Sequence, residues 1–220
     1  MISEAKEGGG RVEDLRLITG TGKYASDWND AGQLYGHFLR ADRSHARILA
    51  VDIAAALVHP DVQHVFTGAD AVSAGYTRMS STLSWLTGRN GTKAKVPLRP
   101  ALAHGKVRFV GEPVALVVAS SAAAAQDAAE LIEISYEELP CVVRSEDALA
   151  SGAPHLHEEI PGNIALECEV GSAEAVETAF AQAAHITRLK VESTRVSPSP
   201  LEPRTCRVAY DESSGEYRFN

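Results

Sequence analysis

The chain has 220 residues, of which 45% are hydrophobic, and its formal charge is −8 because 29 acidic residues outnumber 21 basic ones. This length fits one large domain or two small ones. The acidic balance argues against nucleic-acid binding, and no apolar run approaches the roughly 20 residues of a membrane span, so we expect a cytoplasmic protein without a membrane span.

The first part of the chain is predicted to comprise a flexible arm, residues 1–16, and a folded domain, residues 17–149. Apolar and polar residues alternate well enough at residues 33–40 to predict a β-strand, whose side chains have a period of two. Further strands are expected at residues 46–51 and 62–67. Short helices are expected at 53–57, where Pro60 prevents continuation, and from Gly68 onwards.

Residues 75–100 are predicted to form a long surface loop. Ser, Thr, Gly, Asn and Lys dominate this segment with little periodicity, and its turn is expected at 88–91. Loops of this length are usually functional or mobile. Trp85, within the loop, is either an anchor for a partner or a side chain that packs against its own loop.

A more apolar region follows, interrupted by Gly111-Glu112-Pro113. Further strands are predicted at residues 107–110, 114–119, 133–136 and 141–143. A helix rich in Ala and Glu is predicted at 121–131, with Ser120 as its N-terminal cap. The order of strands and helices predicts an α+β fold in which helices lie against a sheet.

Residues 150–162 are predicted to be a linker, and residues 163–220 a second unit. This unit is expected to contain an amphipathic helix at 172–183, a long strand at 185–194 and a hairpin around residues 211–215. So small a unit rarely holds a core alone. We therefore expect it to be the beginning of a larger domain, incomplete by itself.

Two groups of charged residues are candidates for chemistry. Glu112 is either a general base or a carboxylate that accepts backbone N–H groups across a turn and ties two strands together. Glu202 and Arg204 lie in a proline-rich segment of extended backbone, where they either lock a buried junction or approach a ligand.

For the other candidates we expect structural or solvent-exposed roles rather than chemistry. His155 and His157 suggest metal ligands, but a site needs further ligands, so polar linker residues are the expected outcome. The segment 19–24 departs from a phosphate-binding loop and predicts a structural turn. Three widely spaced cysteines predict partly buried free thiols rather than disulfides or a cluster site, namely Cys141, Cys168 and Cys206.

Several blocks of the sequence form one pattern when their order and spacing are taken together. They are residues 11–24, 44–48, 67–70, 107–115, 128–133 with 136–137, and 195–204. In these blocks the chain resembles the N-terminal part of the large, molybdopterin-binding subunit of the xanthine dehydrogenase/aldehyde oxidase family. The carbon monoxide dehydrogenase-like branch is the most similar.

The resemblance implies a fold and a set of cofactors. Residues 17–149 would be the family's α/β hammerhead domain, and residues 163–220 the incomplete start of its molybdopterin-binding domain. The holoenzyme would be an oxidoreductase, a molybdenum hydroxylase that acts on aldehydes or N-heteroaromatics with water as the oxygen source. It would contain the molybdenum cofactor (molybdopterin), with FAD and 2Fe-2S clusters on partner subunits or domains.

No residue of this chain matches the family's cofactor-contacting loops or its catalytic Glu. We therefore assign no catalytic, cofactor-binding or metal-binding residue here, and expect the isolated chain to be inactive. Its expected partners are the remainder of the molybdenum-binding subunit and the FAD and iron–sulfur subunits. The alternative is a non-catalytic hammerhead module for assembly or binding.

Overall fold

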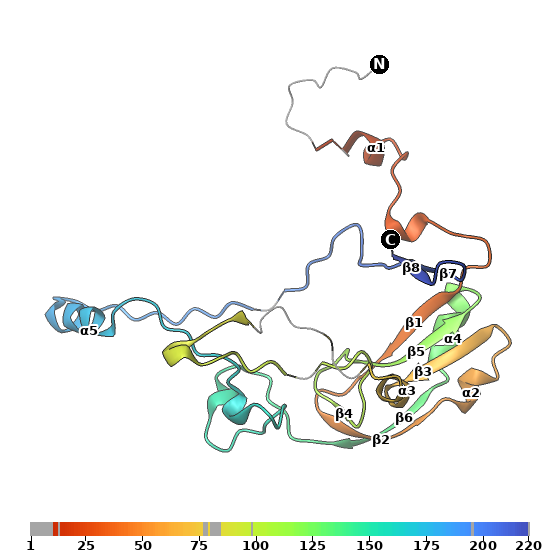
Figure 1. The fold of residues 1–220 in the computed structure, drawn as a ribbon. Helices are drawn as coiled ribbons and strands as arrows, with labels where there is room; N and C mark the ends of the chain where they lie inside the picture. Colours follow the sequence, from red (N-terminus) through yellow and green to blue (C-terminus); the bar gives the residue numbers. More distant parts are fainter. Residues whose placement is uncertain are drawn as a thin grey trace. The chain divides into compact units, whose positions relative to one another are not determined.

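The chain divides into two compact units, which are described separately (Figure 1). The computed structural model describes residues 11–12, 14–76, 79, 85–97, 99–194 and 196–219. The larger unit is Leu34–Ile186, and the smaller one combines Met1–Gln33 with Thr187–Asn220. Most of the predicted arm lies outside the described residues, and the domain boundaries taken from the sequence stay a prediction.

The larger unit combines short helices with antiparallel strands, which confirms the predicted α+β class. Its strands are β1 (Tyr35–Arg40), β2 (Ala46–Asp52), β3 (Val62–Thr67), β4 (Lys106–Val107), β5 (Pro113–Ala119) and β6 (Glu133–Glu138). Its α-helices are α2 (Ala54–Leu57), α3 (Gly68–Ser73), α4 (Ala122–Ala129) and α5 (Ala173–Gln182). Short 3-10 turns occur at Arg89–Gly91, Asp147–Leu149 and Pro161–Asn163.

Two three-stranded sheets organise this unit (Figure 1). The first has the order β1-β5-β3 and the second the order β4-β2-β6, with antiparallel pairing throughout. In the first sheet, Val117 of the central strand lies opposite His37 of β1 and Val65 of β3. Since β4 belongs to one sheet and β5 to the other, the five residues between them carry the chain across.

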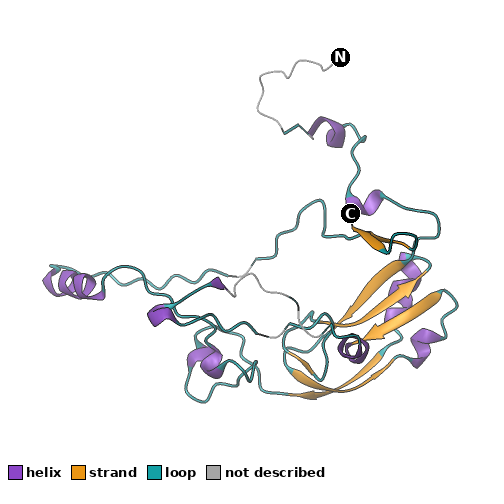
Figure 2. Ribbon diagram, viewed as in Figure 1, coloured by secondary structure: helices purple, strands orange, loops and turns teal. Residues whose placement is uncertain are grey.

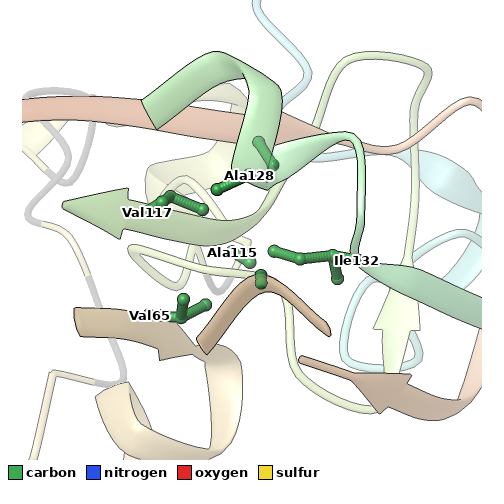
Figure 3. Packing of buried hydrophobic residues seen from close by; sticks show 7 residues of the cluster. Val65, Ala115, Val117, Ala128 and Ile132 are labelled. Atoms are coloured by element: carbon green, nitrogen blue, oxygen red, sulfur yellow. The ribbon is translucent and has the colours of Figure 1, made fainter. Parts of the chain in front are cut away.

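Strand β5 is buried on both faces, which explains its nearly unbroken run of apolar residues. Val114 packs into one cluster and Val117 into another. The first cluster holds Ala41, Ala46, Ala103, Val107 and Val114. The second holds Ala56, Val65, Ala115, Val117, Ala128, Ala129 and Ile132, and joins the first sheet to α2 and α4 (Figure 3).

Helix α4 begins one residue later than predicted. The hydroxyl of Ser121, not of Ser120, accepts the hydrogen bond from the Ala124 N–H, at 3.1 Å. Ser120 instead donates its hydroxyl to Asp61 Oδ1, at 3.0 Å. Two adjacent serines offer the same capping chemistry, so composition alone could not choose between them.

Three predicted strands were wrong or too long. Of the predicted strand at 107–110, only Val107 pairs as a strand, within β4, because the next residues turn, with the Glu112 N–H bonded to the Phe109 carbonyl. Residues 141–143 and 185–194 are loops (Figure 2). Alternation shows that a segment could pair, but a strand also needs a neighbour, and no described strand pairs with these two segments.

The smaller unit contains α1 (Asp14–Ile18), a 3-10 turn at Ala25–Asp27 and the hairpin β7 (Val208–Asp211) with β8 (Glu216–Phe219). This confirms the predicted hairpin. Asp211 Oδ1 accepts the N–H of Ser213 at 3.0 Å, which closes the turn. Cross-strand contact between the rings of Tyr210 and Tyr217, 4.8 Å apart, adds to the pairing.

Candidate functional site

The turn that joins the two sheets centres on Glu112, whose side chain is buried. Its Oε2 accepts the backbone N–H of Arg108 at 2.6 Å, the bond that the sequence suggested for a structural carboxylate. The backbone of the turn also exchanges two bonds with Ala41, at 2.9 and 2.7 Å. Gly111 has φ of +92°, a conformation that side-chain-bearing residues rarely adopt. These contacts fix the crossing between the sheets.

Burial raises the pKa of Glu112 above its ordinary value of 4.5. The backbone N–H groups of Arg108 and Phe109 and the positive charge of Arg108 oppose this shift. The Arg108 side chain itself is engaged elsewhere, since its Nε donates to the Leu156 carbonyl at 3.1 Å. The arrangement suits a structural tie whose strength depends on pH.

The predicted linker packs against this same turn. Lys106 forms an ion pair with Glu158, and this hydrogen bond lowers the pKa of Glu158 to about 2. The amide of Asn163 donates to the carbonyls of Ala148 and Pro154, at 3.0 and 3.1 Å. Residues 148–163 therefore form an ordered layer over β4. Sequence reasoning missed these contacts because they join positions far apart in the chain.

The two linker histidines do not share a partner. His155 Nε2 accepts the Gly162 N–H at 3.2 Å, whereas His157 Nδ1 lies 3.7 Å from Glu159 Oε1. Burial, and then the charge of Arg108, lowers the pKa of His157. Within the described part of the chain, no group of three or more His, Cys, Asp or Glu could hold a metal ion.

In the smaller unit, Glu202 serves as a junction. Its Oε1 accepts the backbone N–H of Ala25 at 3.0 Å, so the N-terminal segment is bonded to the proline-rich one. Asp30 and Arg207 form an ion pair at 3.2 Å, and Trp28 lies beneath the cations of both Lys23 and Arg207. These contacts support a junction at Glu202, but the junction is exposed, which corrects the expected burial. Arg204 is exposed.

The remaining candidates are structural or solvent-exposed. In segment 19–24, the N–H groups of Thr21 and Gly22 bond to the Arg16 carbonyl at 2.8 and 2.6 Å, so this segment is the turn that ends α1. The three cysteines are all exposed, which corrects the expected partial burial. They lie in loop segments that pack against no described core cluster.

No described helix is both long and apolar enough to cross a membrane. Residues 19–140 match a family model described as the a/b hammerhead domain of aldehyde oxidase and xanthine dehydrogenase. This match agrees with the fold expected for the first domain.

Full-length relatives extend the similarity across most of the chain. It is 36% identical to the nicotine 6-hydroxylase large subunit of Paenarthrobacter nicotinovorans over 91% of its length, and 34% identical to the carbon monoxide dehydrogenase large chain of Afipia carboxidovorans over 94%. The chain spans only 24% and 26% of these two relatives.

Solved structures give the same result. Quinoline 2-oxidoreductase from Pseudomonas putida 86 matches 95% of the chain, with a TM-score of 0.79 and 34% identity. The reconstituted CO dehydrogenase from Oligotropha carboxidovorans matches 96% of the chain, with a TM-score of 0.80 and 31% identity. The chain covers 25% and 26% of those two structures.

Proposed function

The chain belongs to the aldehyde oxidase and xanthine dehydrogenase family, and from this premise we propose that it forms the hammerhead-containing part of a molybdenum hydroxylase. The observation that carries the proposal is 36% identity, over 91% of the chain, to a protein named as the large subunit of a hydroxylase. The proposed holoenzyme is an oxidoreductase that hydroxylates aldehydes or N-heteroaromatics with oxygen from water, in the cytoplasm.

The proposed partners are the remainder of the molybdenum-binding subunit and subunits that carry FAD and iron–sulfur clusters. Relatives named as a large subunit, a large chain and a subunit of a dehydrogenase complex support an assembly of several polypeptides. The molybdenum cofactor, when bound in the holoenzyme, supplies the oxidation. The described residues of this chain offer no converging set of metal ligands, so we assign them no step at the metal.

The role proposed for this chain is structural. Residues 17–149 form the hammerhead, residues 150–162 connect it to the next domain, and residues 163–220 begin the molybdopterin-binding domain. Glu112 holds the crossing between the two sheets through the Arg108 N–H, and Glu202 holds the N-terminal segment through the Ala25 N–H. Both carboxylates are therefore proposed to act in folding or assembly rather than in a chemical step.

Purification of the tagged chain from its native cells tests the proposal. We expect it to co-purify with polypeptides that carry molybdenum, iron and flavin, measured by elemental analysis and by the absorption spectrum. The complex is expected to oxidise an aldehyde or an N-heteroaromatic compound with an artificial electron acceptor.

The matched control is the same chain expressed without its neighbours, for which we expect no molybdenum. Stoichiometric molybdenum on this polypeptide alone would contradict the absence of a metal site. A stable complex without molybdenum, iron or flavin would favour the non-catalytic assembly module instead.

A further inference from the structure

A basic segment stands out in this acidic chain. No Asp or Glu occurs between Asp70 and Glu112, although the whole chain carries a formal charge of −8. The same segment contains the basic residues Arg78, Arg89, Lys93, Lys95, Arg99, Lys106 and Arg108. Lys106 and Arg108 are engaged with the layer at 148–163, which leaves the loop as the exposed part of the basic segment.

The described part of this loop contains a small β-hairpin. Thr87 and Lys93 form an antiparallel bridge, the Gly88 N–H donates to the Thr92 carbonyl at 2.7 Å, and the Ala94 N–H donates to the Leu86 carbonyl at 3.2 Å. Trp85 precedes Thr87 by two residues and lies in a 3-10 turn, and Lys95 follows Lys93 by two residues.

One face of the hairpin is exposed and the other is covered. Because side chains alternate along a strand, Lys93 and Lys95 share one face with Thr87, the bridge partner of Lys93. The hydrogen bond from Lys93 Nζ to Thr87 Oγ1, at 2.6 Å, confirms this for the central pair. These three side chains and Trp85 are exposed, Trp85 by 73%, so the alternative that Trp85 packs within its own loop gains no support from the described residues.

The covered side is held by residues 165–169. The Arg89 N–H donates to the Glu167 carbonyl and the Lys95 N–H to the Ala165 carbonyl, each at 2.8 Å. The Arg89 side chain also pairs with Glu169 at 2.6 Å. A Cβ added to Gly88 would lie 2.2 Å from the Glu167 oxygen, so only glycine allows this approach. The hairpin is thus fixed from behind while its outer face remains exposed.

We propose that the exposed surface formed by Lys93 and Lys95 on the hairpin and by the neighbouring Trp85 docks another protein subunit, whose contacting surface is acidic around an apolar recess. Tryptophan is enriched, with tyrosine and arginine, among the residues that anchor protein interfaces, because it buries a large area. Lysines at the rim attract an acidic partner and set its orientation. The occupant follows from this charge complementarity.

The inference rests on the proposed function only because it needs a second subunit. The test uses the purified complex, with the dissociation constant measured by diluting it and following its mass. We expect Trp85→Ala and the double variant Lys93→Glu/Lys95→Glu each to raise the dissociation constant at least about tenfold. Added salt should weaken the wild-type complex more than the double variant, because exposed charges are screened.

The matched control is Arg16→Glu/Arg188→Glu, which makes the same change in net charge at exposed positions outside the hairpin. We expect it to stay within about twofold of wild type. Hydrogen exchange at the amides of Arg89 and Lys95, which donate to the Glu167 and Ala165 carbonyls, checks that the hairpin remains in place. Trp85→Phe, which retains an aromatic ring, should lose less affinity than Trp85→Ala.

Several results would overturn the docking surface. Dissociation constants within about twofold of wild type for both hairpin variants would do so, as would a wild-type complex that is insensitive to salt. So would variants that lose only self-association, or nucleic acid that is bound by wild type and released by the variants. If the complex contains molybdenum but its dissociation constant is unchanged by the substitutions, this inference alone is overturned. A complex without molybdenum that the substitutions still dissociate overturns the proposed function alone. Recovery of the chain without any partner overturns both.

Discussion

Each of the two units is stabilised internally by a different kind of contact. Every buried hydrophobic residue among those described lies in the larger unit, between Ala41 and Ile160. The smaller unit joins its described segments through the Ala25–Glu202 hydrogen bond, the Asp30–Arg207 ion pair and cations over Trp28.

This difference determines how each unit can be stabilised. Burying one aliphatic side chain contributes about 1.5–3 kcal/mol, whereas an exposed ion pair or cation–π contact contributes about 0–1 kcal/mol. In the larger unit, the loss of one exposed polar contact should therefore matter little, and its weak points are its buried side chains. The smaller unit depends on several weak contacts at once.

The largest effect is expected in the core of the larger unit. Val117, which is fully buried, lies on the central strand β5. Val117→Ala should lower the free energy of unfolding by about 2 kcal/mol, from lost burial and the cavity left behind. The control Val208→Ala removes a half-exposed valine from the smaller unit and should stay within about 0.5 kcal/mol. Equal losses in urea unfolding would break the contrast between the units.

The next effect concerns the turn between the sheets. Burial raises the pKa of Glu112 in the folded protein, so the folded state binds this proton more tightly than the unfolded chain does. The stability that Glu112 contributes should therefore fall as the pH rises above 4.5, by about 1.4 kcal/mol for each unit of pKa shift. Glu112→Gln keeps an acceptor for the Arg108 N–H but cannot ionise, so its stability relative to wild type should rise with pH.

Urea unfolding across this pH range measures the difference between the two proteins. Asp70 supplies a control of opposite sign, since hydrogen bonds from Thr67 lower the pKa of its carboxyl. Its contribution should be present at neutral pH and be lost as the pH falls below 3.8 in wild type, but not in Asp70→Asn. A pH-independent difference for Glu112→Gln would show that the buried carboxyl titrates normally.

A smaller effect is expected in the smaller unit. Trp28→Ala removes the ring beneath Lys23 and Arg207, at a cost of about 0.5–1 kcal/mol. Hydrogen exchange should accelerate at residues 202–207 and remain unchanged in β5. Trp28→Phe keeps a weaker aromatic face, so its stability and its exchange rates at residues 202–207 should lie between those of wild type and Trp28→Ala. Faster exchange in β5 would show that the two units are energetically coupled.

The smallest effect is expected for an exposed ion pair of the larger unit. Glu158 pairs with Lys106 but is 66% exposed, so Glu158→Gln should cost less than about 1 kcal/mol. The pKa of Glu158 is lowered to about 2, so the contribution is present above pH 4.5 and is lost as the pH falls towards 2. Hydrogen exchange at residues 155–163, compared at low and high salt, measures the stability that this ion pair contributes. A larger loss than for Val117→Ala would reverse the proposed ranking.

The sequence predicted those parts of the fold that depend on neighbouring residues. Alternation located β1, the apolar run after Glu112 located β5, and β2, β3 and β6 also lie where strands were predicted. Asp211 and the residues after it predicted the β7–β8 turn, because a short polar side chain closes such turns by itself. The backbone bond of Glu112 was likewise predicted, since its partner lies four residues away.

Contacts between distant segments could not be predicted in this way. Nothing near Glu202 indicates that its partner is the Ala25 N–H, and nothing near Gly88 indicates the backbone of Glu167. The predicted strand at 185–194 failed for the same reason, because pairing depends on a neighbour supplied by another part of the polypeptide. Alternation gives the capacity to form a strand, and the tertiary fold decides whether it is used.

The central position of β5 has a consequence for how the protein is made. Among the described strands, β1 and β3 pair with β5 and with no other, so both wait for Pro113–Ala119 to leave the ribosome. At roughly 5–20 residues per second, β3 is exposed for several seconds before its neighbour arrives. Unpaired strand edges are prone to aggregate during such an interval. We therefore expect the nascent chain to need a chaperone until β5 has been synthesised, and the demand to end once the first sheet closes.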